Sequence, residues 1–160
     1  MSSYEERRRE ARMRGYGDVL ANAVIMTMEE LRDVMRRVML YLEKFGNSRF
    51  MRSWGDDSIS ERAGIKVYSR KEKRYVYYFL PHFFANEFGI SPDSLICKID
   101  LIRPFVQKRD VICKVDFFPN SAKTGVVVWY IDNVEHCFDV DVVLMEEYLS
   151  RYFGGEGAGK

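Results

Sequence analysis

The sequence predicts one α+β domain that contains a winged-helix-like unit. Two observations predict it. The chain has 160 residues, which is a single-domain length, and its apolar residues recur first at helical spacing and later in short β-branched and aromatic runs. Hydrophobic residues make up 47% of the chain, enough to bury a core that offsets the entropy of ordering the backbone. We expect a flexible charged arm over residues 1–24, the domain over 25–153, and a disordered glycine-rich tail over 154–160.

An N-terminal amphipathic helix is expected over residues 28–45. Thr27 and Glu30 have the spacing of a capping box, which marks a helix start. Apolar residues then recur at helical spacing, namely Leu31, Val34, Met35, Val38, Leu42 and Phe45. Upstream, Gly15 and Gly17 are expected to interrupt any helix, because glycine has a low helix propensity.

Strand-like runs follow in two groups. Residues 65–80 are rich in β-branched and aromatic types around a charged centre, which is typical of a β-hairpin with a charged tip. The runs 111–118 and 125–131 predict a second hairpin. A further run, 134–140, is read as an additional strand.

Short helices are expected between the two hairpins and at the C-terminal end. The first covers residues 82–88, and the second covers 92–102, with Ser91 as its cap and Pro104 as its stop. A last helix follows Asp141 as its cap. Two helices joined by a short turn and followed by a hairpin have the order of a winged helix, so we expect a winged-helix-like unit covered by the terminal helices.

Charge is balanced overall and uneven along the chain. The net charge is +1, from 25 basic and 24 acidic residues. Residues 44–74 carry nine Lys or Arg against four acids, and residues 98–123 carry six against three. Residues 132–156 carry one Arg against seven acids. This asymmetry indicates a basic face that attracts polyanions and an acidic face that does not, although ordinary solvated surface remains an equal alternative.

The expected function is non-catalytic DNA binding, to single or double strands, because cations neutralise phosphates and read base edges. The residues expected to bind are seven cations of the two basic segments: Arg49, Arg52, Lys98, Arg103, Lys108, Arg109 and Lys123. The predicted recognition helix also carries Asp93 and Asp100, which leaves few groups for reading sequence. Tyr75, Tyr77 and Tyr78 offer rings for unpaired bases, although about half of them must face the core.

The alternative is a protein-interaction adaptor or assembly subunit with the same fold and no nucleic-acid binding. Its partner would be a replication protein or another copy of the chain. The aromatic residues Trp54, Tyr148, Tyr152 and Phe153 favour it, because aromatic anchors dominate interface energetics.

Four short motifs occur in order over about residues 38–131. They are Gly-Asn-Ser-Arg-Phe at 46–50, Arg-Ala-Gly at 62–64, an aromatic strand with Leu-Pro at 77–84, and Glu-Phe-Gly at 87–89. This arrangement resembles the C-terminal segment of helicase-like and primase-helicase proteins of phages and integrating elements. The ATPase core of that family precedes the segment, so the resemblance implies an accessory DNA-handling module of a phage or mobile-element replication system, without motor activity.

Enzyme chemistry is not expected. His82 and His136 are the only histidines, so the paired ligands of a zinc site are lacking, and no nucleophile motif frames any of the three cysteines. Residues 154–160 match a Gly-x-x-x-x-Gly-Lys loop, but no strand feeds it and no helix follows it, as phosphate binding requires. We therefore expect no metal, no cofactor and no nucleotide effect.

The expected location is the cytoplasm. The N-terminal residues are charged and lack the apolar core of a secretory signal. No apolar run approaches the roughly 20 residues of a membrane span. The odd number of cysteines suits a reducing compartment in which thiols pack as small hydrophobes.

Overall fold

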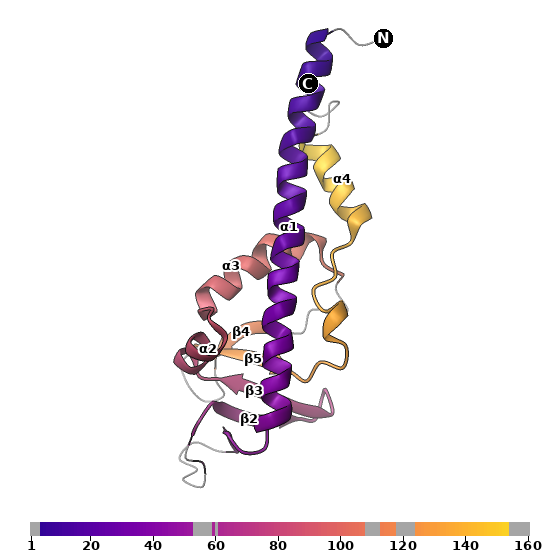
Figure 1. Ribbon diagram of the computed structural model, residues 1–160. Coiled ribbons are helices and arrows are strands. Elements are labelled where there is room, and N and C mark those ends of the chain that lie inside the picture. Colours follow the sequence, from indigo (N-terminus) through magenta and orange to yellow (C-terminus); the bar gives the residue numbers. More distant parts are fainter. Residues whose placement is uncertain (1–3, 53–58, 60, 108–112, 118–123, 154–160) are drawn as a thin grey trace.

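The computed structural model describes residues 4–52, 59, 61–107, 113–117 and 124–153. Within these residues the fold is α+β, as predicted, with four α-helices and a five-stranded sheet. A long N-terminal helix lies across one face of the sheet, and its first turns project beyond the rest of the domain (Figure 1). The glycine-rich tail, with its Gly-Lys motif, lies outside the described residues.

The N-terminal helix, α1, spans Tyr4–Phe45, so the predicted start at residue 28 is wrong. Thr27 does not cap the helix, because its hydroxyl donates to the carbonyl of Ala23 at 2.7 Å, one turn back. A threonine inside a helix can satisfy its hydroxyl in this way, so the capping-box spacing did not mark a helix start. Gly15 and Gly17 also lie inside α1, since each glycine costs only about 1 kcal/mol in a long helix.

The sheet contains both predicted hairpins. Its order is β1-β2-β3-β5-β4, antiparallel except for the parallel pair β1 and β2. The strands are β1 (Phe50–Met51), β2 (Gly64–Ser69), β3 (Arg74–Phe79), β4 (Cys113–Phe117) and β5 (Thr124–Trp129). The second hairpin therefore adds to the first through β3 and β5, which makes one continuous sheet.

The run 134–140 does not form the predicted strand. Val134–His136 form a 3₁₀ helix, η3, and Val140 makes only an isolated bridge to Val106. In a strand, successive side chains point to opposite faces, whereas Cys137 and Phe138 are both buried. Phe138 achieves this with a left-handed backbone, φ 58°.

The short helices agree with the sequence. Helix α2 spans Pro81–Phe88 and ends at Gly89, whose φ of 70° is left-handed. Helix α3 spans Pro92–Ile102, and the following 3₁₀ turn η1 (Arg103–Phe105) contains the proline that stops it.

The predicted helix caps are confirmed. The Ser91 hydroxyl accepts from the amide of Ser94 at 3.2 Å. Helix α4 spans Val142–Phe153, and the Asp141 carboxylate accepts from the amide of Leu144 at 3.1 Å. Both contacts satisfy amides that a helix N-terminus leaves unpaired.

The core lies between α1 and the sheet, with α2 and α3 closing one side. It contains an aromatic cluster around Phe79, which is fully buried. Five rings lie within 6.4 Å of the Phe79 ring, centroid to centroid: Tyr41, Phe50, Phe83, Phe84 and Phe88. This cluster joins α1, β1, β3 and α2.

Two of the three cysteines behave as the predicted small hydrophobes. Cys113 and Cys137 are buried, whereas Cys97 is exposed. Burial raises the pKa of Cys113 to about 12 and that of Cys137 to about 11. We expect one thiol per chain, Cys97, to react rapidly with an aromatic disulfide at about pH 8, since only a thiolate is reactive.

The same burial predicts how stability depends on pH. Between the ordinary thiol pKa of 9.0 and the raised values, the unfolded chain releases protons that the folded chain retains. The free energy of unfolding should therefore fall as pH rises above about 9. Urea unfolding at several pH values measures the slope, and Cys113→Ala should reduce it. An unchanged slope in that variant would contradict the assignment.

Candidate nucleic-acid interface

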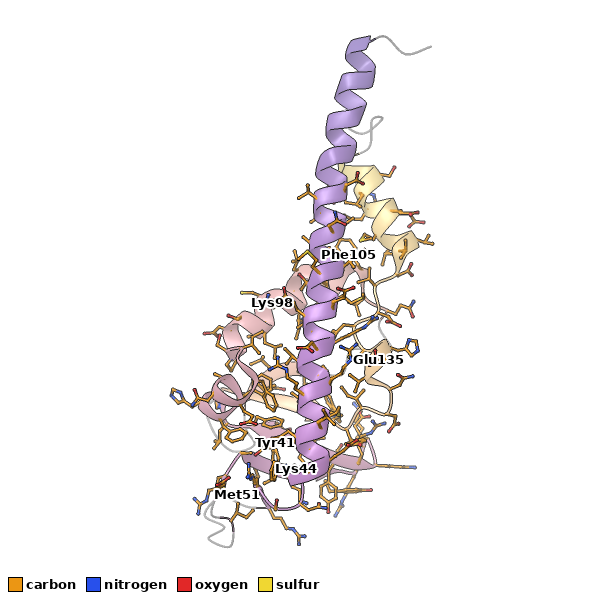
Figure 2. All side chains as sticks on the ribbon, in the orientation of Figure 1. Tyr41, Lys44, Met51, Lys98, Phe105 and Glu135 are labelled. Carbon is orange, nitrogen blue, oxygen red and sulfur yellow. The ribbon has the colours of Figure 1, made fainter. Side chains whose placement is uncertain are left out.

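The predicted binding residues fall into two separate regions. Lys108, Arg109 and Lys123 lie outside the described residues. Of the rest, Lys98 lies in α3 and Arg103 directly follows it, whereas Arg49 and Arg52 flank β1 beyond the end of α1. Figure 2 shows Lys98 and Met51, the neighbour of Arg52, at different levels of the molecule. These four cations therefore do not form one continuous stripe.

Carboxylates neutralise both cations of the α3 region. The Lys98 Nζ lies 2.5 Å from a Glu30 oxygen of α1, and Arg103 pairs with Asp100 at 3.1 Å. A cleft between α1 and the α2–α3 turn is lined by two acids, Glu30 and Asp33, and by the two cations that pair with them, Lys98 and Arg37. The charges on this side of α3 are therefore balanced within the protein.

Arg49 is held by the protein itself. Its guanidinium pairs with Glu61 at 2.9 Å, donates to the Tyr41 hydroxyl at 3.3 Å, and lies over the Phe45 ring, 3.5 Å from the centroid. The hydrogen bond with Tyr41 raises the pKa of Arg49. We infer that Arg49 fixes the end of α1 against the chain that follows it.

Lys66, which is not among the residues expected to bind, lies beside Arg52. Lys66, on β2, is only 7% exposed, and its Nζ donates to the Asn47 side-chain oxygen at 3.1 Å. Among the described residues, no carboxylate forms an ion pair with it. Burial, and then the like charge of Arg52, lowers the pKa of Lys66.

Strand pairing explains this arrangement. In the parallel pair, Phe50 is opposite Gly64 and Met51 is opposite Ile65, so the next residues in register are Arg52 and Lys66. Since side chains alternate along a strand, Lys66 shares its face with the core residue Phe50. Helix α1 ends at Phe45, before it can cover this end of the sheet.

Two tyrosines extend the uncovered face. Tyr68 and Tyr75 are directly opposite in the β2–β3 pair, with ring centroids 5.3 Å apart and planes at 76°. They are 53% and 45% exposed, and the Lys66 Nζ is 5.0 Å from the Tyr75 centroid. Of the predicted stacking residues, only Tyr75 serves this face, because Tyr77 packs on Phe50 in the core and Tyr78 points to the opposite face.

We call this region the basic end. It comprises the residues between the end of α1 and the tip of the β2–β3 hairpin that offer cations, an amide or an exposed ring: Lys44, Asn47, Arg52, Lys66, Tyr68, Arg70, Lys71, Lys73, Arg74 and Tyr75. Apart from Lys66, which is buried, its cations are exposed. Figure 2 shows Lys44 and Met51 at this end.

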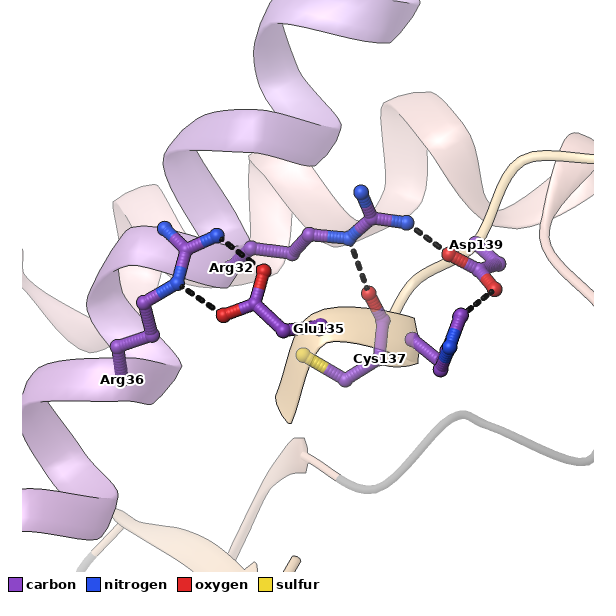
Figure 3. A network of polar contacts seen from close by, with 6 residues as sticks. Arg32, Arg36, Glu135, Cys137 and Asp139 are labelled. Carbon is purple, nitrogen blue, oxygen red and sulfur yellow. Dashed lines mark hydrogen bonds and ion pairs between the residues drawn. The ribbon is translucent and has the colours of Figure 1, made fainter. Parts of the chain in front are cut away.

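A different charged network fastens η3 to α1 (Figure 3). Arg32 pairs with Asp139 and donates to the Cys137 carbonyl at 3.0 Å. Arg36 makes a two-pronged contact with Glu135 at 2.7 and 2.8 Å. Asp139 also contacts His136 at 3.1 Å. The role of this network is therefore to attach the segment after β5 to α1.

We expect Arg32→Ala to cost about 1–3 kcal/mol of unfolding free energy, because it strips a half-buried carboxylate and a carbonyl of their donor. Arg36→Ala is the matched control, and it should leave the melting temperature almost unchanged, since its ion pair is exposed. Thermal unfolding of both variants measures the difference. Equal losses would show that the Arg32 contacts add nothing beyond surface charge.

Among the described residues, no group of three or more His, Cys, Asp or Glu side chains is arranged to hold a metal ion. Likewise, none of the helices in the described ranges has the length and apolar character needed to cross a bilayer. Comparison of the chain with protein-family models, curated proteins and solved structures finds no match. The resemblance to helicase-like proteins therefore stays a prediction.

Proposed function

We propose that this protein is a non-catalytic nucleic-acid-binding module whose basic end contacts the phosphate backbone. One observation carries the proposal: the four cations of the β2–β3 hairpin lie between the exposed Tyr68 and Tyr75 in the chain, and Lys66 lies 5.0 Å from the Tyr75 ring. Within the described residues no carboxylate forms an ion pair with these cations or with Arg52. A surface of this kind attracts a polyanion, and its rings can stack on bases.

The order of the elements supports a winged-helix-like unit as the finer fold assignment. Helices α2 and α3 lie between β3 and β4, and the hairpin β4–β5 returns to pair with β3. We place the contact surface at the basic end and not on α3, because the cations of α3 are neutralised within the protein. The setting that we propose, a phage or mobile-element replication system, rests on the resemblance of the sequence motifs alone.

A protein-interaction adaptor is the second candidate, and exposed apolar side chains favour it. They lie on α1 and at the start of α4, at Val19, Met26, Val142 and Val143, with Tyr152 further along α4. Tyr148, expected as an exposed anchor, packs instead on Phe105 with centroids 5.0 Å apart. Trp54 and the side chain of Phe153 lie outside the described part of the chain.

Fluorescence anisotropy with labelled DNA tests the proposed function. Affinity should fall steeply between about 50 and 200 mM salt, because each neutralised phosphate releases counterions. Lys71→Glu combined with Lys73→Glu should weaken binding by about tenfold or more, since two phosphate contacts become repulsive.

The matched control reverses two exposed cations elsewhere, Arg103→Glu with Arg151→Glu, and should bind as the unchanged protein does. The proposal fails if the protein binds neither single-stranded nor duplex DNA at low salt. It fails equally if the control loses affinity and the hairpin variant does not.

A further inference from the structure

Lys66 differs from an ordinary buried lysine in the partners of its ammonium group. A buried ammonium normally has a carboxylate partner, because transfer of a charge out of water is costly. Lys66 has three N–H donors, and the structure describes one acceptor for them, the Asn47 side-chain oxygen. Among the described residues, the other group in contact with its Nζ is the face of the Tyr75 ring, 5.0 Å from the ring centroid. The site therefore retains donor capacity and positive charge.

Arg52 adds a second cation beside the first. The β1–β2 register brings Arg52 next to Lys66 at the sheet edge, and the like charge of Arg52 contributes to lowering the pKa of Lys66. Two neighbouring cations that repel each other are both stabilised when an anion lies between them. A phosphate group has the charge and the acceptor oxygens to do so.

The Tyr68–Tyr75 pair lies on the same face of the sheet as Lys66, further along β2. Lys66 and Tyr68 are two residues apart on β2, which is about 7 Å along a strand and comparable to the reach of one nucleotide from phosphate to base. Tyr68 and Tyr75 meet edge to face, so the pair presents ring surface to solvent. Base–aromatic stacking of this type tolerates any sequence, since every base has a π face.

We propose that Lys66, Arg52 and the Tyr68–Tyr75 pair form a nucleotide subsite for single-stranded nucleic acid, with the phosphate on the cations and the base on the rings. The subsite rests on the proposed function and specifies its substrate class. A duplex can offer phosphates to the hairpin tip, but its bases are stacked inside, so it cannot use the tyrosines. Single strands should therefore bind more tightly than duplexes.

Anisotropy with a labelled single strand of about 16 nucleotides and with the matching duplex tests the subsite. Tyr68→Ala combined with Tyr75→Ala should weaken single-strand binding by about tenfold or more and leave duplex binding unchanged. Tyr68→Phe combined with Tyr75→Phe keeps the rings and should bind as the unchanged protein does. Lys66→Met should also weaken single-strand binding, whereas Lys66→Arg should retain most of it.

Competition identifies the source of the anion. Unlabelled single strand should displace the probe, and inorganic phosphate at the same phosphate concentration should not, because phosphate alone cannot stack. Displacement by inorganic phosphate would overturn the assignment to a strand.

Failure of the subsite is distinguishable from failure of the proposed function. If the alanine variant loses no affinity for single strands, or loses the same factor for both strand forms, the subsite is wrong although nucleic-acid binding stands. If Lys66→Met changes only thermal stability, the lysine is a structural support for the end of α1. If no strand binds the unchanged protein, both proposals are wrong.

Discussion

Alanine in place of Phe79 is expected to lower the free energy of unfolding by about 3–5 kcal/mol. The side chain is fully buried at the point where α1, β1, β3 and α2 meet. Its removal leaves a cavity bounded by rings such as Phe50 and Phe84, whose centroids lie 5.1 and 5.5 Å away. The surrounding rings come from three elements, α1, β1 and α2, and they cannot collapse into the space without moving the elements themselves.

Urea unfolding measures this loss, with Tyr68→Ala as the matched control. Tyr68 is also an aromatic residue of the sheet, but it is 53% exposed, so its removal should change stability by no more than about 1 kcal/mol. A Phe79→Ala variant as stable as this control would mean that the aromatic cluster is not the centre of the core.

Gly64→Ala should be nearly as damaging, although it adds one methyl group. A Cβ at position 64 would lie 1.9 Å from the carbonyl oxygen of Tyr78 and 2.8 Å from its carbonyl carbon. These are backbone atoms of the paired strand, where Gly64 is opposite Phe79, so relief requires the two strands to separate. We expect a loss of about 3 kcal/mol or more.

Gly17→Ala is the control with the opposite sign. No atom lies within 4 Å of a Cβ placed there, and the residue is inside α1, so alanine should stabilise the helix by about 0.5–1 kcal/mol. Circular dichroism should show unchanged or greater helix content. If Gly64→Ala is tolerated and Gly17→Ala is not, the close β2–β3 approach and the continuous α1 are both wrong.

Local signals predicted the fold where local physics decides it. The caps at Ser91 and Asp141 and the left-handed Gly89 depend on contacts within a few residues, so the sequence displays them. The Thr27 capping box failed because the same spacing is compatible with a helix interior. The prediction of a strand at 134–140 was wrong because the consecutive core residues Cys137 and Phe138 require a turn there.

The candidate site depends on partners that are distant in sequence. Lys98 resembled a DNA-binding residue until the fold brought Glu30 against it from α1. Lys66 belonged to the basic segment 44–74, but its burial beside Arg52 follows from a parallel pairing of β1 with β2. No spacing rule predicts such a pairing from a two-residue strand, so the charge asymmetry indicated a basic segment without identifying the buried lysine in it.

If the basic end is the surface that contacts nucleic acid, its backbone amides should respond to a bound strand. Amide chemical shifts of isotope-labelled protein, followed during titration with a single-stranded oligonucleotide, report this contact residue by residue. We expect the largest shifts at Asn47, Arg52 and along β2 and β3 from Lys66 to Tyr75, with α3 and α4 almost unaffected. Shifts concentrated on α3 or α4, with the β2–β3 hairpin unchanged, would contradict it.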